Sequence, residues 1–386
     1  MQYSDKALNL QESNTLAISA LAQNLAKSGK EIINLSTGEP DFDTPQSVKD
    51  TAIGAINQGF SKYTAVSGIL NLKEAICEKL ARDNQLHYQP QEIIVSNGAK
   101  HSLFNALGAI LNPQDEVIIP APYWVSYPEM VKYNQATPIF IQTTQENHFK
   151  ITPKDLQEAI TPKTKAIILN SPSNPTGSIY NKEEIIELAK VLEGSDIWVI
   201  SDEIYEKLVY DSSFVSIPSL SQDLLTRTIL VNGLSKSSAM TGWRMGYLAS
   251  KDRTLLKIID NIQSNSTSNI NSFTQMASIT ALNLKGEIEE MRGIFEQRRD
   301  FAYQAAQSIA PLRLNKPQGA FYLFIDISKT PYPNSLDFCQ FLLERQGVAL
   351  VPGIAFGAEG FVRMSFATSI KTLQKGFEKI ARFLEN

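Results

Sequence analysis

Short apolar runs alternate with amphipathic helical patterns through the middle of this chain. The candidate strands are Glu92–Ser96, Val117–Ile119, Ala166–Leu169, Ile197–Ile200, Thr228–Val231 and Met245–Leu248. Stretches such as His101–Leu111 and Lys182–Glu193 have the spacing of helices that connect them. Strands that are apolar throughout are typical of a sheet covered on both faces. The pattern predicts an α/β fold with a mostly parallel sheet, in which ligands bind beyond the carboxyl ends of the strands.

The C-terminal third has a different pattern, with a long charged helix over about 284–309 and strand candidates at Phe321–Ile325 and Phe361–Phe366. At 386 residues the chain is longer than one hydrophobic core usually serves. We therefore expect a large domain at 46–285. A smaller α+β domain is expected to combine 1–45 with 286–386.

The composition of the chain argues against several classes of function. The formal net charge is −4 with both signs interspersed, which argues against a surface for nucleic acid. No apolar stretch is long enough for a bilayer span, and the first residues lack the apolar core of a secretion signal. Three scattered histidines lack metal-ligand spacing, and two cysteines suit a reducing compartment. We expect a cytoplasmic protein with small-molecule partners, no metal and no membrane contact.

Polar motifs follow several of the predicted strands. Ser96–Lys100 opens a helix with small residues, which lets backbone N–H groups approach an anion. Its spacing is neither that of a dinucleotide-binding loop nor that of a P-loop. Trp124 lies in another such loop, where an indole can stack on a flat ring. Taken singly, an ordinary turn and a packing residue explain these two motifs better.

Two further motifs favour a binding function. Asn170–Gly177 contains two prolines and a glycine directly after a strand, a turn that would aim Asn174 into a site. Asp202 ends another strand, and a carboxylate in such a covered place needs a cationic partner. Tyr205 would face the same side if a helical turn begins there. A tight turn and a helix cap are the structural alternatives.

Three cationic side chains are further candidates for a binding site. Lys236 and Arg244 follow the strand Thr228–Val231, and Arg363 lies in an apolar strand pattern. A carbonyl cofactor that carries a phosphate needs a nucleophilic amine and a rigid cation. Arg363 is placed to bind a carboxylate, either of a substrate or of the protein.

Together these segments resemble the class I aminotransferases of fold type I that use pyridoxal phosphate, and among them the bacterial aspartate aminotransferase subgroup. The resemblance runs from Ser36–Pro45 to Arg363. It includes Asn174–Gly177, Asp202–Tyr205 and the run Leu234–Arg244. Chance agreement of all five segments is negligible.

The resemblance implies a pyridoxal 5'-phosphate site. Lys236 matches the amine that bonds the cofactor and later carries a proton, and Asp202 matches the carboxylate that keeps the ring nitrogen protonated. The other residues that match cofactor contacts are Tyr205, Asn174, Trp124, Ala99, Lys100, Ser235 and Arg244. Tyr63 matches a tyrosine that reaches the phosphate of a neighbouring subunit, which implies a homodimer with shared sites.

The resemblance also implies the substrate contacts. Arg363 and the Gly38 backbone match the clamp on the α-carboxylate, beside Trp124 and Asn174. Lys100 matches a lysine that reads a distal carboxylate, which favours aspartate with 2-oxoglutarate in a ping-pong reaction. Many subgroup members have a lysine for larger acids such as prephenate where this chain has Gln11–Thr15.

Other functions remain open. An aromatic, prephenate or broad-specificity aminotransferase would use the same groups, as would a carbon–sulfur lyase or an amino-acid cyclising synthase of the same fold. A non-catalytic regulator would carry an N-terminal DNA-binding domain, and only about 35 residues precede the first motif, fewer than such a domain needs. The retained Lys236 also favours an enzyme.

Overall fold

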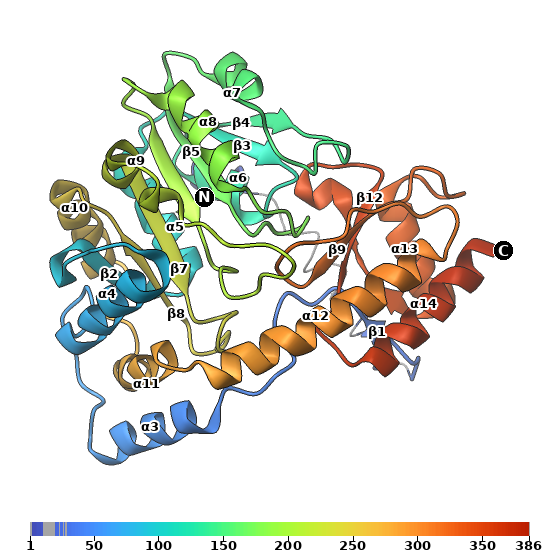
Figure 1. The fold of residues 1–386 in the computed structure, drawn as a ribbon, viewed down its shortest axis with the longest axis horizontal. Helices are drawn as coiled ribbons and strands as arrows, with labels where there is room; N and C mark the ends of the chain where they lie inside the picture. The colour runs from blue at the N-terminus through green and yellow to red at the C-terminus, as the bar shows by residue number, and fades with distance from the viewer. Residues whose placement is uncertain (1, 11–19, 23, 26, 28, 386) are drawn as a thin grey trace.

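The structure is a computed structural model and describes residues 2–10, 20–22, 24, 25, 27 and 29–385. Its centre is a seven-stranded sheet in the order β2-β8-β7-β6-β5-β3-β4 (Figure 1). The strands are β2 (Ile93–Asn97), β3 (Glu116–Ala121), β4 (Thr137–Gln142), β5 (Thr164–Asn170), β6 (Trp198–Asp202), β7 (Thr228–Gly233) and β8 (Met245–Ala249). Strand β8 alone runs antiparallel to its neighbours, so the predicted mostly parallel sheet is confirmed.

Strand β4 was not predicted from the sequence. It lies at the edge of the sheet beside β3, and several of its side chains are exposed or half-buried. Its run Ile139–Ile141 is apolar like the other strands, but Pro138 directly precedes it, and a proline weakens the strand pattern of its segment. Pro138 also fits this position, because an edge strand can spare one N–H group.

Helices cover both faces of this sheet. The helices of this region are α3 (Gln46–Asn57), α4 (Leu70–Asn84), α5 (Ala99–Ile110), α6 (Ser126–Tyr133), α7 (Pro153–Ala159), α8 (Lys182–Leu192), α9 (Gln222–Arg227), α10 (Arg253–Ser264) and α11 (Ser272–Leu282). Neighbouring strand residues face opposite cores: Ile94 packs with α5 and α10, and Val95 packs with α4 and α11. Burial on both sides explains why these strands are apolar throughout.

Side-chain caps fix where several helices begin. Thr152, Asn181, Asp252 and Asn271 each accept a hydrogen bond from a backbone N–H in the first turn of α7, α8, α10 and α11. Such a cap satisfies a donor that the helix itself leaves unpaired. These four helices therefore have defined starts.

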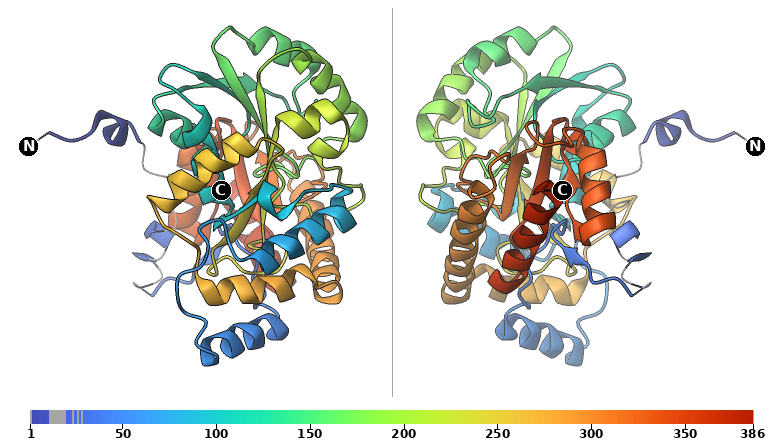
Figure 2. Two further views of the ribbon diagram at one scale, coloured as in Figure 1. Left: turned by 90° about the vertical axis from the view of Figure 1, so that its left-hand side faces the viewer. Right: turned by 90° about the vertical axis from the view of Figure 1, so that its right-hand side faces the viewer.

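The C-terminal part packs against one end of the sheet (Figures 1 and 2). Its elements are α12 (Gly286–Gln307), β9 (Tyr322–Asp326), α13 (Ser335–Gln346), β10 (Val348–Ala349), β11 (Val351–Pro352), the 3-10 turn Gly353–Phe356, β12 (Phe361–Ser365) and α14 (Ile370–Glu385). Strands β11, β12 and β9 form an antiparallel sheet. Strand β1 (Ile33–Asn34) pairs in parallel with β10, which joins an early segment to this part.

Residues 2–10, which include α1 (Asp5–Leu8), project beyond the body of the molecule in Figure 2. Helix α1 has no buried residue. Within the described residues, no helix combines the length and the apolar character that crossing a membrane requires.

Candidate active site

One cavity of about 420 Å³ opens at the carboxyl ends of the central strands. Every predicted site residue except Tyr63 lines it: Gly38, Ala99, Lys100, Trp124, Asn174, Asp202, Tyr205, Ser235, Lys236, Arg244 and Arg363. The large sheet supplies most of these residues through the loops after its strands, and β12 supplies Arg363. The tertiary structure thus brings together residues that are hundreds of positions apart.

The amine of Lys236 lies in the loop after β7. Its Nζ donates a hydrogen bond to the carbonyl oxygen of Gly38 at 2.5 Å. The pKa of this amine is lowered from 10.5 to about 8, chiefly by burial. The nearby cations Arg363 and Arg244 act in the same direction, and acidic neighbours oppose them. An amine with this pKa has a useful neutral fraction near neutral pH, and the neutral form is the nucleophile.

Asp202 is the last residue of β6 and is 3% exposed. Burial raises the pKa of its carboxyl group to about 6, although two donors oppose this shift. The hydroxyl of Tyr127 donates to Oδ2 at 2.6 Å, and the backbone N–H of Ile204 donates to Oδ1 at 3.2 Å. A buried carboxylate of this kind suits a cationic group in the cavity.

The guanidinium of Arg363 is buried and only partly satisfied. Nη1 donates to Asn174 Oδ1 at 3.0 Å, and Nη2 donates to the Ser36 carbonyl oxygen at 2.9 Å. Its Nε has no hydrogen-bond partner among the described residues. The group lies over the ring of Tyr322, 4.3 Å from the centroid. The Arg363 guanidinium can therefore bind a carboxylate without moving from its position.

Tyr205 is buried beside this arginine. Its hydroxyl lies 2.9 Å from that of Tyr322, and either oxygen can be the donor. Burial raises the pKa of Tyr205 well above its ordinary value, so the hydroxyl stays protonated. It is available as a donor to an oxygen in the cavity.

The start of α5 forms a cradle with Arg244. Gly98 has φ +83°, and a Cβ added there would lie 2.4 Å from Nη2 of Arg244. A Cβ on Gly246 would lie 2.2 Å from the backbone nitrogen of Ala99. The two glycines therefore let the arginine and the helix start approach each other. A cation beside a helix N-terminus is a suitable site for a phosphate.

Lys100 lies over the indole of Trp124, with Nζ 4.9 Å from the ring centroid. Burial lowers the pKa of this amine, and Arg244 lowers it further. The half-buried indole leaves one flat surface on the cavity. Pyridoxal phosphate requires a surface for its ring, a cradle for its phosphate, an amine and a carboxylate for its ring nitrogen. Trp124, the start of α5 with Arg244, Lys236 and Asp202 provide these groups. The residues present therefore fit the cofactor that the resemblance implies.

Tyr63 is the predicted residue that the cavity does not include. It lies between α3 and α4 and is 90% exposed. Its predicted role involves a second subunit.

Several residues of the site were missed in the sequence. Tyr127, Tyr322, Phe356 and Thr241 line the same cavity. Tyr127 follows Trp124 by three positions, which places it one helical turn further on. Tyr322 and Phe356 had no such signal, because apolar surroundings in a C-terminal strand pattern indicate core residues.

Comparisons with known proteins place this chain in a family. The family described as aminotransferase class I and II matches residues 30–380. The chain is 46% identical to the aspartate aminotransferase of Bacillus subtilis (strain 168), over 100% of this chain and 99% of that one. It is also 46% identical to the aspartate/prephenate aminotransferase of Nitrosomonas europaea, over the full length of both.

Two solved structures are similar over nearly the whole chain. The aspartate aminotransferase of Rhizobium meliloti has a TM-score of 0.96 at 42% identity, covering 100% of this chain and 99% of that one. The enzyme of Thermus thermophilus with maleate has a TM-score of 0.96 at 40% identity, covering 100% of both chains.

Proposed function

This chain belongs to the class I and II aminotransferases, and from that premise we propose that it moves an amino group from aspartate to 2-oxoglutarate. It is an enzyme that depends on pyridoxal phosphate and acts on amino acids and 2-oxo acids. The choice of aspartate is supported by the names of the relatives. The observation that carries the proposal is the single cavity shared by the Lys236 amine, the Asp202 carboxylate and the Arg363 guanidinium.

We assign the following roles to the residues that hold the cofactor. Asp202 would keep the ring nitrogen protonated, because among the described residues no cation forms an ion pair with its buried carboxylate. Trp124, Tyr205 and Asn174 would hold the ring. The helix start at Ala99 and Lys100, with Ser235 and Arg244, would hold the phosphate. When bound, the cofactor supplies a ring that withdraws electrons from the substrate Cα.

Lys236 and Arg363 act on the substrate in this proposal. Arg363 binds the α-carboxylate with its partly unsatisfied guanidinium, helped by the Gly38 backbone. Lys236 Nζ would hold the cofactor through its carbonyl carbon, and as a neutral amine it would take up the proton from the substrate Cα. Burial favours the neutral amine that this transfer needs. The Lys100 ammonium binds the distal carboxylate of aspartate.

A second candidate is an aminotransferase for both aspartate and prephenate. Several relatives with this name are 43–46% identical to the chain. The segment Gln11–Thr15, on which the sequence argument against prephenate depends, lies outside the described residues. Aspartate remains the substrate that all these names share.

The test is a set of rapid half-reactions of the cofactor-loaded enzyme with single amino acids. Aspartate and glutamate should convert the cofactor to its amine form faster than alanine or phenylalanine, without elimination products. If aspartate reacts no faster than alanine or phenylalanine, the specificity proposal is wrong. Adding prephenate to the amine form tests the second candidate.

Two variants test the assigned roles. Arg363→Leu removes a charged carboxylate contact and should raise the apparent KM for aspartate by about 100-fold. Lys236→Ala should still bind the cofactor but lose the transfer step. An unchanged KM in the first variant, or full turnover in the second, would contradict the assignment.

We also propose a homodimer in which Tyr63 reaches the partner's phosphate. Tyr63, Ile53, Ile56 and Leu70 are large exposed side chains near α3, which is unusual for a surface that faces only water. Light scattering should give twice the chain mass. Tyr63→Phe should weaken cofactor binding without changing this mass, whereas a monomer in solution would refute the shared site.

We also propose the domain boundaries and the cellular compartment of the protein. We place the large domain at 46–285 and the small domain at 1–45 with 286–386, supported by separate hydrophobic cores. One includes residues of α12, α13 and α14, and the other includes residues of α4, α11 and the central sheet. We also propose the cytoplasm, since Cys77 and Cys339 are both free thiols, as a reducing compartment favours.

A further inference from the structure

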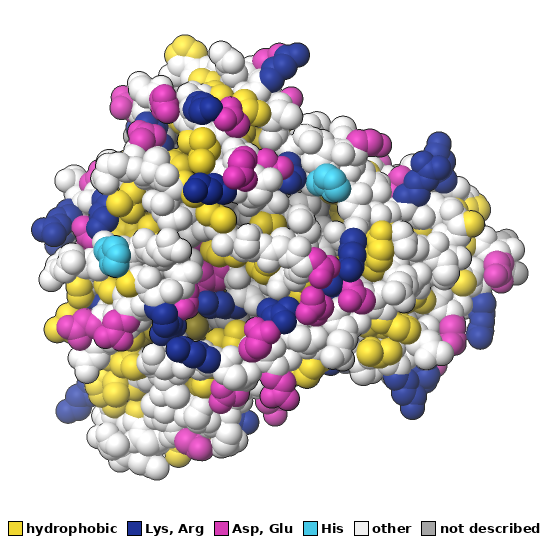
Figure 3. Space-filling model, in the orientation of Figure 1, with side chains coloured by type: hydrophobic (Ala, Val, Ile, Leu, Met, Phe, Trp, Pro, Cys, Tyr) yellow, Lys and Arg dark blue, Asp and Glu magenta, His cyan; other side chains and the backbone are white. Residues whose placement is uncertain are grey.

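A second cavity, of about 320 Å³, lies beneath the loop that carries Lys236. Residues of α4, β7, β8 and the link from α11 to α12 line it. In the space-filling view, Lys and Arg side chains gather with acidic ones around a hollow near the middle of this face (Figure 3). The assigned roles of the active site use none of the side chains that line this second cavity.

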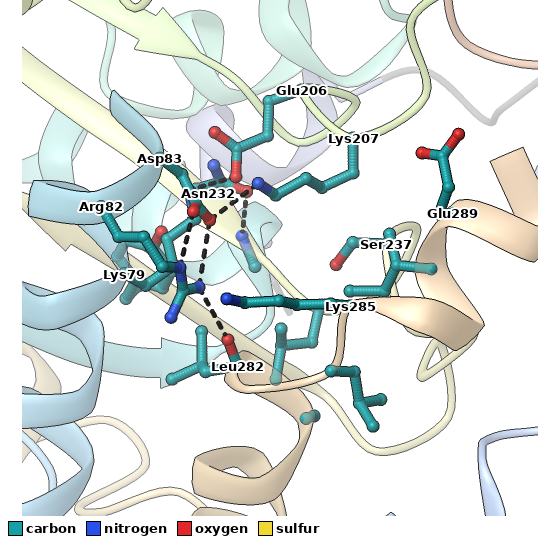
Figure 4. A pocket seen from close by; sticks show the side chains of 16 residues that line it. Lys79, Arg82, Asp83, Glu206, Lys207, Asn232, Ser237, Leu282, Lys285 and Glu289 are labelled. Atoms are coloured by element: carbon teal, nitrogen blue, oxygen red, sulfur yellow. Dashed lines mark hydrogen bonds and ion pairs between the residues drawn. The ribbon is translucent and has the colours of Figure 1, made fainter. Parts of the chain in front are cut away.

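The acidic side chains of this cavity already have cationic partners. Asp83 accepts from Arg82 Nε at 2.7 Å and from Lys207 Nζ at 2.7 Å. Glu206 is paired with Lys79 and also accepts from Asn84 at 2.8 Å. Figure 4 shows these pairs side by side along one wall. These carboxylates therefore have little capacity left for a further cation.

Glu289, the remaining acidic group of the lining, is bound by Arg292. Arg292 Nη2 donates to Glu289 Oε1 at 2.6 Å. In Figure 4 the Glu289 carboxylate lies apart from the other charged groups. It adds little negative charge to the centre of the cavity.

Some hydrogen-bond donors of the cavity have no acceptor among the described residues. Asn232 is 2% exposed and its Nδ2 has no partner among the residues that the structure describes, while its Oδ1 accepts from the Gly233 N–H at 2.7 Å. Tyr247 is 1% exposed, and within the same described part of the chain its hydroxyl also has no partner. Leaving such buried groups unpaired is unfavourable. Among the described residues, the exposed ammonium of Lys285 makes no ion pair either, and it extends toward Arg82 in Figure 4.

These three donors come from β7, β8 and the start of α12 and meet one cavity. Burial and the nearby acids raise the pKa of Tyr247 well above its ordinary value, so its hydroxyl remains a donor. Within the described part of the chain, the cavity therefore has hydrogen-bond donors without acceptors, and it has one positive charge, that of Lys285, without a negative partner. A ligand that offers only acceptor oxygens and carries negative charge would satisfy all three groups.

We propose that this cavity is a second binding site, separate from the active site, for a small oxyanion such as phosphate or a short carboxylate. Asn232 Nδ2, Tyr247 Oη and Lys285 Nζ are its direct donors, and Arg82 and Lys207 add positive charge at its wall. Gly233, Leu234 and Ser237 also line the cavity, so the bound anion lies next to the loop that holds Ser235 and Lys236.

The test is calorimetric titration of the cofactor-loaded enzyme with inorganic phosphate and, separately, with succinate. The loaded cofactor fills the phosphate cradle of the active site, and Arg363→Leu removes the carboxylate contact there. This variant should still bind one anion per chain. Comparing the two probes shows whether phosphate or a carboxylate is the preferred oxyanion.

Substitutions at the second site should remove this binding. In the Arg363→Leu background, Lys285→Met and Tyr247→Phe should each weaken it by about tenfold, since a charge-assisted hydrogen bond is lost. Lys257→Met, on α10 and outside this cavity, is the matched control for removal of one exposed charge and should leave affinity unchanged.

A measurement of thermal unfolding covers the case in which a variant is damaged. Tyr247→Phe removes a hydroxyl that has no partner, so without anion its Tm should equal or exceed that of the unsubstituted protein. The rise in Tm that phosphate or succinate causes should be smaller in the variant.

Two results would overturn the proposal. One is that neither anion binds Arg363→Leu saturably at tens of millimolar. The other is that Lys285→Met and Tyr247→Phe bind as tightly as Lys257→Met. Neither result bears on the half-reactions, so the second site and the proposed function can fail independently.

Discussion

Lys236 illustrates how burial changes the chemistry of one side chain. Desolvation penalises the charged ammonium, and the cations Arg363 and Arg244 act in the same direction. Glu39 and Asp202 oppose them without cancelling the effect of burial. The result is an amine that reaches its neutral form about two pH units earlier than an ordinary lysine, whose pKa is about 10.4.

This shift predicts a pH dependence in the cofactor-free protein. Only the neutral amine reacts with acetic anhydride, which does not itself titrate, so modification of Lys236 should increase with a midpoint near pH 8 and level off above it. Exposed lysines should continue to gain reactivity toward their ordinary pKa of about 10.4. Mass spectrometry after timed exposure can follow each site. A midpoint for Lys236 near 10.5 would show that burial does not act as described.

Tyr127 is a positioning residue that acts through Asp202. Its hydrogen bond of 2.6 Å favours the ionised carboxylate and opposes the effect of burial. In Tyr127→Phe the pKa of Asp202 should therefore rise by about one unit above its value of about 6. Protonated Asp202 cannot pair with a cationic ring nitrogen, so cofactor affinity should start to fall at a higher pH during acidification.

The measurement is the cofactor dissociation constant between pH 5 and 8. Tyr210→Phe is a matched control, because its buried hydroxyl also donates at 2.6 Å, to the Ala320 carbonyl oxygen, and Tyr210 does not line the cavity. The control should keep the pH profile of the unsubstituted enzyme. A Tyr127→Phe profile that matches it would assign Tyr127 a purely structural role.

Among elements, the contact between β8 and the start of α5 depends on glycine. A Cβ on Gly246 would lie 2.2 Å from the Ala99 nitrogen and 2.3 Å from the Gly98 carbonyl carbon, both of them backbone atoms. Backbone cannot rotate away as a side chain can, so the helix start would have to move. That helix start is one wall of the phosphate cradle.

Gly246→Ala should therefore destabilise the protein by roughly 1–3 kcal/mol and weaken cofactor binding. Gly293→Ala is the contrast, because Gly293 lies within α12 and nothing lies within 4 Å of an added Cβ. That change should stabilise the protein by up to about 1 kcal/mol. Denaturant unfolding and a cofactor titration give both quantities. Equal stability of the two variants would exclude the close contact as the reason for glycine.

Elements also differ in how well the sequence predicts them. The central strands were predicted from uninterrupted apolar runs, and helices such as α8 from their spacing. Strand β4 was missed because Pro138 stands beside its short apolar run, and a proline weakens a strand pattern. The two-residue strands β1 and β10 had no usable pattern, since pairing between segments far apart in the chain defines them.

On the scale of the whole molecule, the active site depends on contacts between distant parts of the chain. Arg363 Nη2 reaches the Ser36 carbonyl oxygen across 327 positions. Lys236 reaches Gly38 across 198 positions. The cavity is closed only where the C-terminal strands pack against the end of the central sheet.

The sequence alone determined the sheet type and the identities of the main polar residues, because apolar runs, turn residues and isolated charges are local features. It also determined the family, through the motifs at Asn174, Asp202 and Lys236. Only the tertiary structure decided that Tyr127 donates to Asp202, that Tyr322 supports Arg363 and that Asn232 and Tyr247 meet in a second cavity. Such contacts depend on which distant segments pack together, and no local pattern records that.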